Sequence, residues 1–179
     1  MKQPARHPDR HNDYVNGSVA LLLTVQSLSA QADTVGAEFG WDGRRVRHLL
    51  DRYGSEIHTL MALCREQADL AEPLQHAPDY LRAEIAYGCT HEGALHLEDL
   101  LTHRTRLTYE IADSGLAALP EIAVLAAPRL GWNDERRDAE IRAYTERVEA
   151  ERAASEQPDD ASAAEARAAA PEVVDVTVG

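Results

Sequence analysis

The feature that most constrains the fold is a pair of apolar stripes with helical spacing that follow one another almost without a gap. The first stripe consists of Val46, Leu49, Leu50 and Tyr53. The second, just beyond Gly54, consists of Ile57, Leu60, Met61 and Cys64. Apolar residues at this spacing lie on one face of an α-helix. Asp42 is a suitable N-cap for the first helix, and Gly54 suits its C-terminal end. We therefore expect two amphipathic helices with buried stripes.

The same periodicity recurs in residues 80–107, which we expect to form two further helices. The first would carry the stripe Leu81, Ile85 and Cys89, and the second the stripe Leu97, Leu100 and Leu101. Gly93 lies between the two stripes and favours a break in the helix there. The preceding residues 69–78 contain two prolines, which predicts an irregular connection.

Two more helices are expected before the chain loses its periodicity. Residues 116–127 are apolar and rich in alanine, with Pro120 in the first turn or at a kink and with Pro128 and Gly131 ending the helix. A last helix, capped by Asn133 or Asp134, would direct three residues inward: Ile141, Tyr144 and Val148. A composition with much alanine and a single Phe also favours helices over a sheet sandwich. The fold class predicted is all-α, a compact bundle of about six short helices with disordered N- and C-terminal tails.

The domain boundaries follow from where the periodicity starts and stops. We assign residues 1–41 to a largely irregular N-terminal extension, residues 42–155 to the helical domain, and residues 156–179 to a disordered acidic tail rich in alanine and proline. Residues 19–25 are apolar and precede an A-x-A pattern at residues 30–32, as in a signal peptide. The long leader contains Asp9 and Asp13, which weighs against that interpretation and leaves the role of residues 1–41 open. The apolar run is too short to span a bilayer.

Charge and cysteine content exclude several classes of protein. The net charge of −13 repels phosphate backbones, so we expect no binding to nucleic acid. Cys64 and Cys89 are too few and too far apart for a disulfide framework. Both lie at apolar helix positions, so we interpret them as small core residues of a cytoplasmic protein.

The candidate site residues are two arginines that follow directly on the Leu97/Leu100/Leu101 stripe. Arg104 and Arg106 could interact with the dipole at the end of their helix, or could form a planar, bidentate contact with a carboxylate. Glu84 and Glu92 are the nearest candidate partners in the sequence. A guanidinium that starts from the core side of a helix needs such a partner, because its burial without one is costly.

No residues are expected to act as catalytic, cofactor-binding or metal-binding groups. The polar residues of the same region are His91, Glu92, His96, Glu98, Asp99 and His103, and two pairs among them have the i, i+4 spacing of metal ligands. The expected helix break, the lack of a cysteine and the missing HExxH order favour a solvated helix face instead. Gly36, Gly40 and Gly43 lack the spacing and the preceding strand of a dinucleotide-binding turn.

Several short segments, taken in order, resemble the C-terminal domain of FAD-dependent (aerobic) glycerol-3-phosphate dehydrogenases and α-glycerophosphate oxidases. The segments are residues 52–55 (RYGS), 71–74 (AEPL), 80–84 (YLRAE), 97–101 (LEDLL), 104–107 (RTRL), 130–132 (LGW) and 147–152 (RVEAER). All of them fall, in order, within the region of residues 44–152 that the resemblance covers. The chain departs from the family pattern at His103, where the family has a basic residue that belongs to a pair.

The resemblance implies a function for a larger protein than this segment. Enzymes of the family oxidise sn-glycerol 3-phosphate to dihydroxyacetone phosphate and pass electrons through FAD to quinone or oxygen, and their flavin-binding half has no counterpart here. We therefore expect an isolated C-terminal helical domain that is not catalytic alone. It would be either the remnant of a truncated gene or a subunit that docks on a separately encoded FAD-binding subunit, with Arg104 or Arg106 facing outward. The alternative is a free-standing helical interaction module unrelated to glycerol metabolism.

Overall fold

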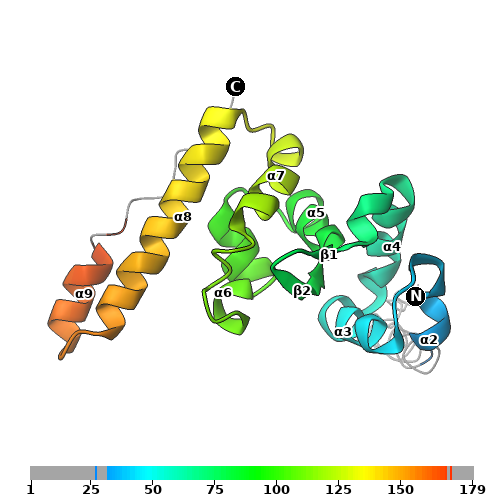
Figure 1. Cartoon of the computed structure of the whole chain (residues 1–179), viewed down its shortest axis with the longest axis horizontal. Coiled ribbons are helices and arrows are strands. Elements are labelled where there is room, and N and C mark those ends of the chain that lie inside the picture. Colours follow the sequence, from blue (N-terminus) through cyan, green and yellow to red (C-terminus); the bar gives the residue numbers. More distant parts are fainter. Residues whose placement is uncertain (1–26, 28–31, 169, 171–179) are drawn as a thin grey trace, which may run out of the picture. The chain divides into compact units, whose positions relative to one another are not determined.

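The computed structural model describes Ser27, residues 32–168 and Ala170. The described residues divide into two compact units, one that ends at residue 59 and one that starts at residue 60. Figure 1 shows that nearly all of the regular structure in both units is helical. The apolar residues 19–25 and the last nine residues lie outside the described part of the chain.

The first unit contains the first of the two predicted stripes. Its elements are α2 (Ala32–Val35), η1 (Ala37–Phe39), α3 (Gly43–Tyr53), η2 (Gly54–Glu56) and the start of α4 (Ile57–Glu66). The Asp42 carboxylate caps α3 by accepting a hydrogen bond from the N–H of Arg45 at 2.8 Å. Val46, Leu49 and Leu50 are buried, as the stripe predicts. The second stripe, along α4, is buried as well.

The second unit begins with the rest of α4 and with η3 (Ala68–Ala71), and these are followed by a feature that the sequence did not predict. Within the stretch expected to be irregular, β1 (Pro73–Leu74) pairs with β2 (Ala77–Leu81) as an antiparallel hairpin. Tyr80 and Leu81 therefore belong to a strand, and α5 begins only at Arg82 and ends at Thr90. The cause is local, because the Glu84 carboxylate accepts a hydrogen bond from the Leu81 N–H at 2.8 Å. This bond is half of a capping box, which fixes the start of the helix.

The helix expected around Leu97, Leu100 and Leu101 is a π-helix, η4 (Asp99–Arg104). Its wide turn is closed by Thr105, whose N–H and hydroxyl both donate to the carbonyl of Leu100, at 2.9 and 2.7 Å. Gly93 has a φ of 66° and lies in the turn between α5 and η4, where the break was predicted. π-helical turns are rare and occur often at functional sites.

Three helices follow η4 and complete the core of this unit. They are α6 (Leu107–Glu110), α7 (Leu119–Leu130) and the long α8 (Asp134–Ser155). Pro120 lies in the first turn of α7, as one of the two predicted options has it. Pro128 does not end α7 but lies inside it, and the helix continues to Gly131, which adopts the left-handed conformation of a C-cap.

A further helix, α9 (Asp160–Ala168), forms within the segment that we predicted to be disordered. The Asp159 carboxylate accepts hydrogen bonds from the backbone N–H groups of Ala161 and Ser162, which lower its pKa and start the helix. The helix lies alongside α8 (Figure 1), with Ala163 buried and Arg167 paired to Glu151 at 3.1 Å. Alanine is the strongest helix former, so α9 needs no wide apolar stripe.

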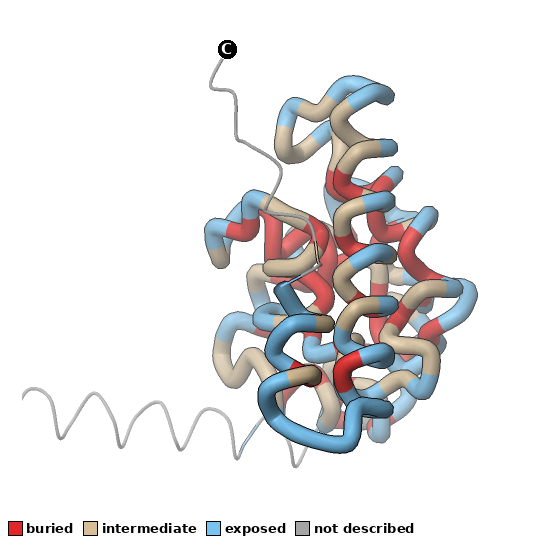
Figure 2. The backbone as a smooth tube through the Cα atoms, turned by 90° about the vertical axis from the view of Figure 1, so that its left-hand side faces the viewer, coloured by how far each residue is buried: buried red, intermediate tan, exposed pale blue. Residues whose placement is uncertain are grey.

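The predicted all-α fold class is confirmed, with the short hairpin as a minor addition. Along the helices, buried and exposed positions alternate with each turn (Figure 2), as expected for elements that pack one face against a core. In the described part of the chain, no helix has both the length and the apolar character needed to cross a bilayer.

Candidate functional site

The turn that carries the candidate arginines presents them to solvent. His103, Arg104 and Arg106 are all exposed, and the residue of this turn that enters the core is Thr105, which is fully buried. Arg106 has a φ of 64°, a left-handed conformation that is uncommon for a residue with a side chain. We call residues 103–106 the basic turn. Its backbone is fixed by Thr105, so its cationic side chains start from a rigid base.

The two candidate carboxylates are placed differently from one another. Glu84 is fully buried in the first turn of α5, where it holds the Leu81 N–H. Glu92 is half-buried just after α5. The stem of Arg104 lies close to Gly88 of α5, because a Cβ atom built on Gly88 would be 3.6 Å from the Cβ of Arg104. A pairing of either arginine with Glu84 or Glu92 remains a prediction.

Sequence reasoning missed a buried ionic cluster, which is centred on Glu140 in α8. One oxygen of the Glu140 carboxylate lies 2.9 Å from Nδ1 of His96 and 2.7 Å from a guanidinium nitrogen of Arg136. The other oxygen accepts a hydrogen bond from the N–H of Leu97 at 3.1 Å. The carboxylate is 3% exposed. It therefore anchors α8 to the chain just before η4, with each oxygen hydrogen-bonded.

A signal for this cluster was present in the sequence. Glu140, Tyr144 and Val148 are spaced by four residues and all three are buried, whereas Ile141, which we expected to face inward, is only half-buried. A carboxylate in line with a buried stripe indicates a buried polar contact. The partner could not be read from the sequence, because His96 lies 44 residues away.

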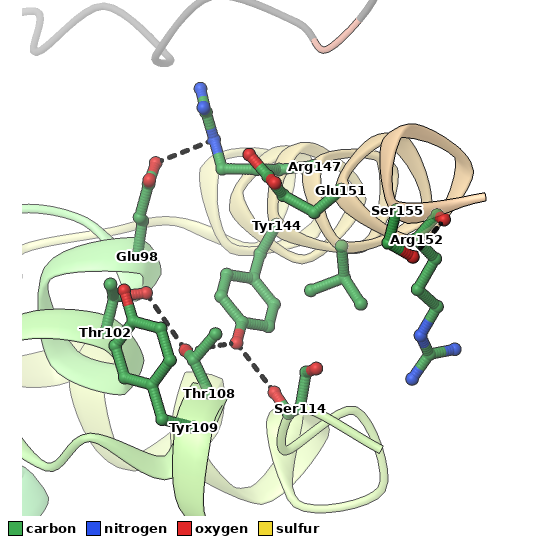
Figure 3. A pocket seen from close by; sticks show the side chains of 11 residues that line it. Glu98, Thr102, Thr108, Tyr109, Ser114, Tyr144, Arg147, Glu151, Arg152 and Ser155 are labelled. Carbon is green, nitrogen blue, oxygen red and sulfur yellow. Dashed lines mark hydrogen bonds and ion pairs between the residues drawn. The ribbon is translucent and has the colours of Figure 1, made fainter. Parts of the chain in front are cut away.

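Beside this anchor, α8 and the residues around α6 enclose a cavity of about 410 Å³ (Figure 3). A chain of hydroxyl groups runs along one wall. The phenol of Tyr144 donates to the carbonyl of Ser114 at 2.7 Å and lies 2.8 Å from the hydroxyl of Thr108. That hydroxyl lies 2.9 Å from the hydroxyl of Thr102. Burial raises the pKa of Tyr144 to about 12, so its phenol keeps its proton at neutral pH.

The charged residues that line the cavity are mostly paired. Arg147 forms an ion pair with Glu98 at 2.9 Å, and Glu151 forms one with Arg167 of α9 at 3.1 Å. Within the described part of the chain, the guanidinium of Arg152 has neither a hydrogen bond nor an ion pair. The cavity therefore has one cationic group that remains available to a ligand.

The described residues contain neither the strand-turn-helix of a dinucleotide site nor a cluster of metal-ligating side chains. A dinucleotide site needs a parallel strand that leads through a glycine-rich turn into a helix, and the sheet of the described chain is a single antiparallel hairpin. Among the described residues, no group of three or more His, Cys, Asp or Glu is placed so that it could hold a metal ion. This holds for the six polar residues considered in the sequence, which are His91, Glu92, His96, Glu98, Asp99 and His103.

Comparison with known proteins identifies the class of domain. Residues 17–137 match the family model of the C-terminal domain of α-glycerophosphate oxidase. The chain therefore belongs to this family of helical C-terminal domains, as the sequence segments suggested. No solved structure matches it.

Curated relatives give the particular context of the domain. The chain is 49% identical over 146 residues to glycerol-3-phosphate dehydrogenase of Mycobacterium leprae and 47% identical, over the same length, to glycerol-3-phosphate dehydrogenase 2 of Mycobacterium tuberculosis. Each match covers 82% of this chain and 25% of the relative. A probable mitochondrial glycerol-3-phosphate dehydrogenase of Dictyostelium discoideum is 34% identical over 97 residues. The chain thus spans about a quarter of the length of these mycobacterial relatives.

Proposed function

We propose that this chain is the helical accessory domain of an FAD-dependent glycerol-3-phosphate dehydrogenase and acts by docking on a flavin-binding part. The observation that carries the proposal is the extent of the match, which covers 82% of this chain but 25% of the M. leprae enzyme. The remaining three quarters of such an enzyme would hold the flavin and oxidise glycerol 3-phosphate to dihydroxyacetone phosphate. The domain would contribute packing surface and no catalytic group.

We propose the basic turn, residues 103–106, as part of the docking surface. Its cationic side chains are exposed on a chain whose net charge is −13, so they offer a local site for carboxylates of a partner. The buried Thr105 and the π-helix before it hold the turn in place, which lowers the entropic cost of docking. We also propose a cytoplasmic location, which agrees with two buried cysteines, Cys64 and Cys89, that are not joined in a disulfide.

The experiment combines the purified 179-residue chain with the M. leprae relative from which the matching C-terminal quarter has been removed. Alone, this chain should be colourless and inactive with glycerol 3-phosphate and an artificial electron acceptor. Together, the two parts should co-elute in size-exclusion chromatography and oxidise glycerol 3-phosphate. A flavin spectrum at about one equivalent on this chain alone, or a failure of the two parts to associate, would contradict the proposal.

The arginines can be tested in the same mixture. Arg106→Ala and Arg104→Ala should each weaken the association by about tenfold, the effect of losing one charged contact worth ~1.4 kcal/mol. Arg142→Ala is the matched control, because Arg142 is also exposed but lies on α8. Equal affinities of all three variants would exclude the basic turn from the interface without affecting the proposed function itself.

A further inference from the structure

The hydroxyl chain in the cavity beside α8 has a direction that its atoms alone determine. The phenol of Tyr144 has a single hydrogen, and it donates this hydrogen to the carbonyl of Ser114, which can only accept. The hydroxyl of Thr108 must therefore donate to Tyr144, at 2.8 Å. Thr108 then has no second hydrogen, so Thr102 must donate to Thr108, at 2.9 Å.

This direction leaves an acceptor at the open end of the chain. The Thr102 oxygen uses its only hydrogen on Thr108 and accepts no hydrogen bond from any described residue. The neighbouring Glu98 carboxylate is a second acceptor, and its charge is balanced by Arg147 at 2.9 Å. A ligand group at this end must therefore donate hydrogen bonds, and an uncharged hydroxyl suits a neutralised carboxylate better than an ammonium group does.

The other end of the cavity has the opposite character. Figure 3 shows Arg152 on the far side of Tyr144 from Thr102 and Glu98. The Arg152 guanidinium, without a partner in the described part of the chain, offers five N–H donors in a planar fork that matches a carboxylate or a phosphate. The buried side chain of Val148 also lines the cavity and adds an apolar surface to it.

We propose that this cavity binds a small organic anion that also carries hydroxyl groups, with the anionic group on Arg152 and a ligand hydroxyl donating to Thr102. The volume of about 410 Å³ is within the range of small-molecule sites. Tyr109, which is 69% exposed, also lines the cavity. None of the residues that line the cavity belongs to the basic turn, and the proposal involves no flavin chemistry.

The experiment is a calorimetric titration of the full chain, without any flavoprotein, with three probes: glycerol 3-phosphate, glycerol and inorganic phosphate. Glycerol 3-phosphate should bind about tenfold or more tightly than either fragment, because it alone satisfies both ends. Arg152→Ala should lower the affinity for glycerol 3-phosphate and for phosphate by about tenfold. Arg142→Ala, on the same helix but outside the cavity, should change neither. An effect of Arg142→Ala as large as that of Arg152→Ala would reduce the result to general electrostatics and overturn the site.

The hydroxyl end is tested by Thr102→Val and Thr102→Ser, each with a melting curve to verify folding. Thr102→Val should reduce the affinity for glycerol 3-phosphate to that for phosphate and leave phosphate binding unchanged. Thr102→Ser keeps the acceptor and should restore glycerol 3-phosphate binding. An unchanged affinity in Thr102→Val, a failure of Thr102→Ser to restore binding, or the lack of any binding to the wild-type chain would refute the proposal. None of these results depends on whether the chain docks on a flavin-binding part.

Discussion

The carboxylate of Glu140 lies 2.9 Å from the imidazole Nδ1 of His96, a residue 44 positions earlier in the chain. This contact connects α8 to the start of the π-helical segment, and the same carboxylate holds the N–H of Leu97 and the guanidinium of Arg136. Loss of this buried carboxylate would be costly, because it removes the acceptor that these three donors share.

Glu140→Ala should lower the free energy of unfolding by about 3–5 kcal/mol, the usual cost of breaking a buried ion pair on one side. Glu140→Gln, which keeps an oxygen for one donor, should lower it by less. Urea denaturation followed by circular dichroism measures both. Glu149→Ala removes an exposed carboxylate from the same helix and should change stability by no more than about 0.5 kcal/mol. Equal effects at positions 140 and 149 would contradict the anchoring role.

Gly88→Ala should destabilise the protein, although a glycine in the interior of a helix normally costs about 1 kcal/mol relative to alanine. A Cβ atom at Gly88 would lie 2.8 Å from Cδ2 of Leu100, so the fully buried Leu100 side chain or the segments that hold it would have to shift. The expected loss is about 1–3 kcal/mol in chemical denaturation, as for an overpacked core.

The double variant Gly88→Ala/Leu100→Ala provides the control for this contact. If the clash causes the loss, the combined effect should be smaller than the sum of the two single effects, since the shorter side chain at position 100 leaves room for the methyl group. Additive effects would show that the two segments do not approach as closely as the structure has them.

Arg106→Gly should be tolerated better than Arg104→Gly. Arg106 has a φ of 64°, where glycine carries no strain, so the gain of about 1 kcal/mol in the folded state offsets the added freedom of the unfolded chain. Arg104 lies within the π-helix, and glycine there should cost about 0.5–1 kcal/mol. Thermal melting of both variants tests the difference, and a lower Tm for Arg106→Gly than for Arg104→Gly would refute the assigned backbone conformation.

The titration of Tyr144 should make stability depend on pH in the alkaline range. Burial raises its pKa from 10.0 to about 12 in the folded state, so the unfolded chain loses this proton first as the pH rises. The contribution of protonated Tyr144 to the free energy of unfolding is fully present below pH 10 and declines between about pH 10 and pH 12. Denaturation of the wild type and Tyr144→Phe across this window should show the decline in the wild type alone after correction for the other groups. An equal slope for both proteins would place the raised pKa elsewhere.

Local patterns in the sequence predicted the helices, and contacts between distant residues account for what it did not predict. The stripes at Val46/Leu49/Leu50 and Ile57/Leu60/Met61 are buried because periodicity alone determines which face of a helix is apolar. The start of α5 directly after the hairpin depends on the Glu84 carboxylate, and the wide turn of the π-helix is closed by Thr105. Neither capping contact has a periodic signature, so neither could be foreseen.

The site followed the same division. The exposed arginines were singled out from sequence because two cations after an apolar stripe are conspicuous, although the sequence suggested that one of them starts from the core side. Glu140 and the hydroxyl chain were missed, because their partners belong to elements that only the fold brings together. Tyr144 was expected to face inward, but nothing near it in the sequence indicated that its phenol would form hydrogen bonds with Thr108 and Ser114.

Three residues on one face of α8 fix how the helix is rotated about its own axis. Glu140, Tyr144 and Arg147 follow one another at about one helical turn, and each engages a different part of the chain between His96 and Ser114. A residue inserted between Arg136 and Glu140 would rotate all three by about 100° relative to the start of the helix. All three contacts would then be lost together. The helix therefore has a fixed phase as well as a fixed position, and changes in its length are tolerable only beyond its last contact with the core.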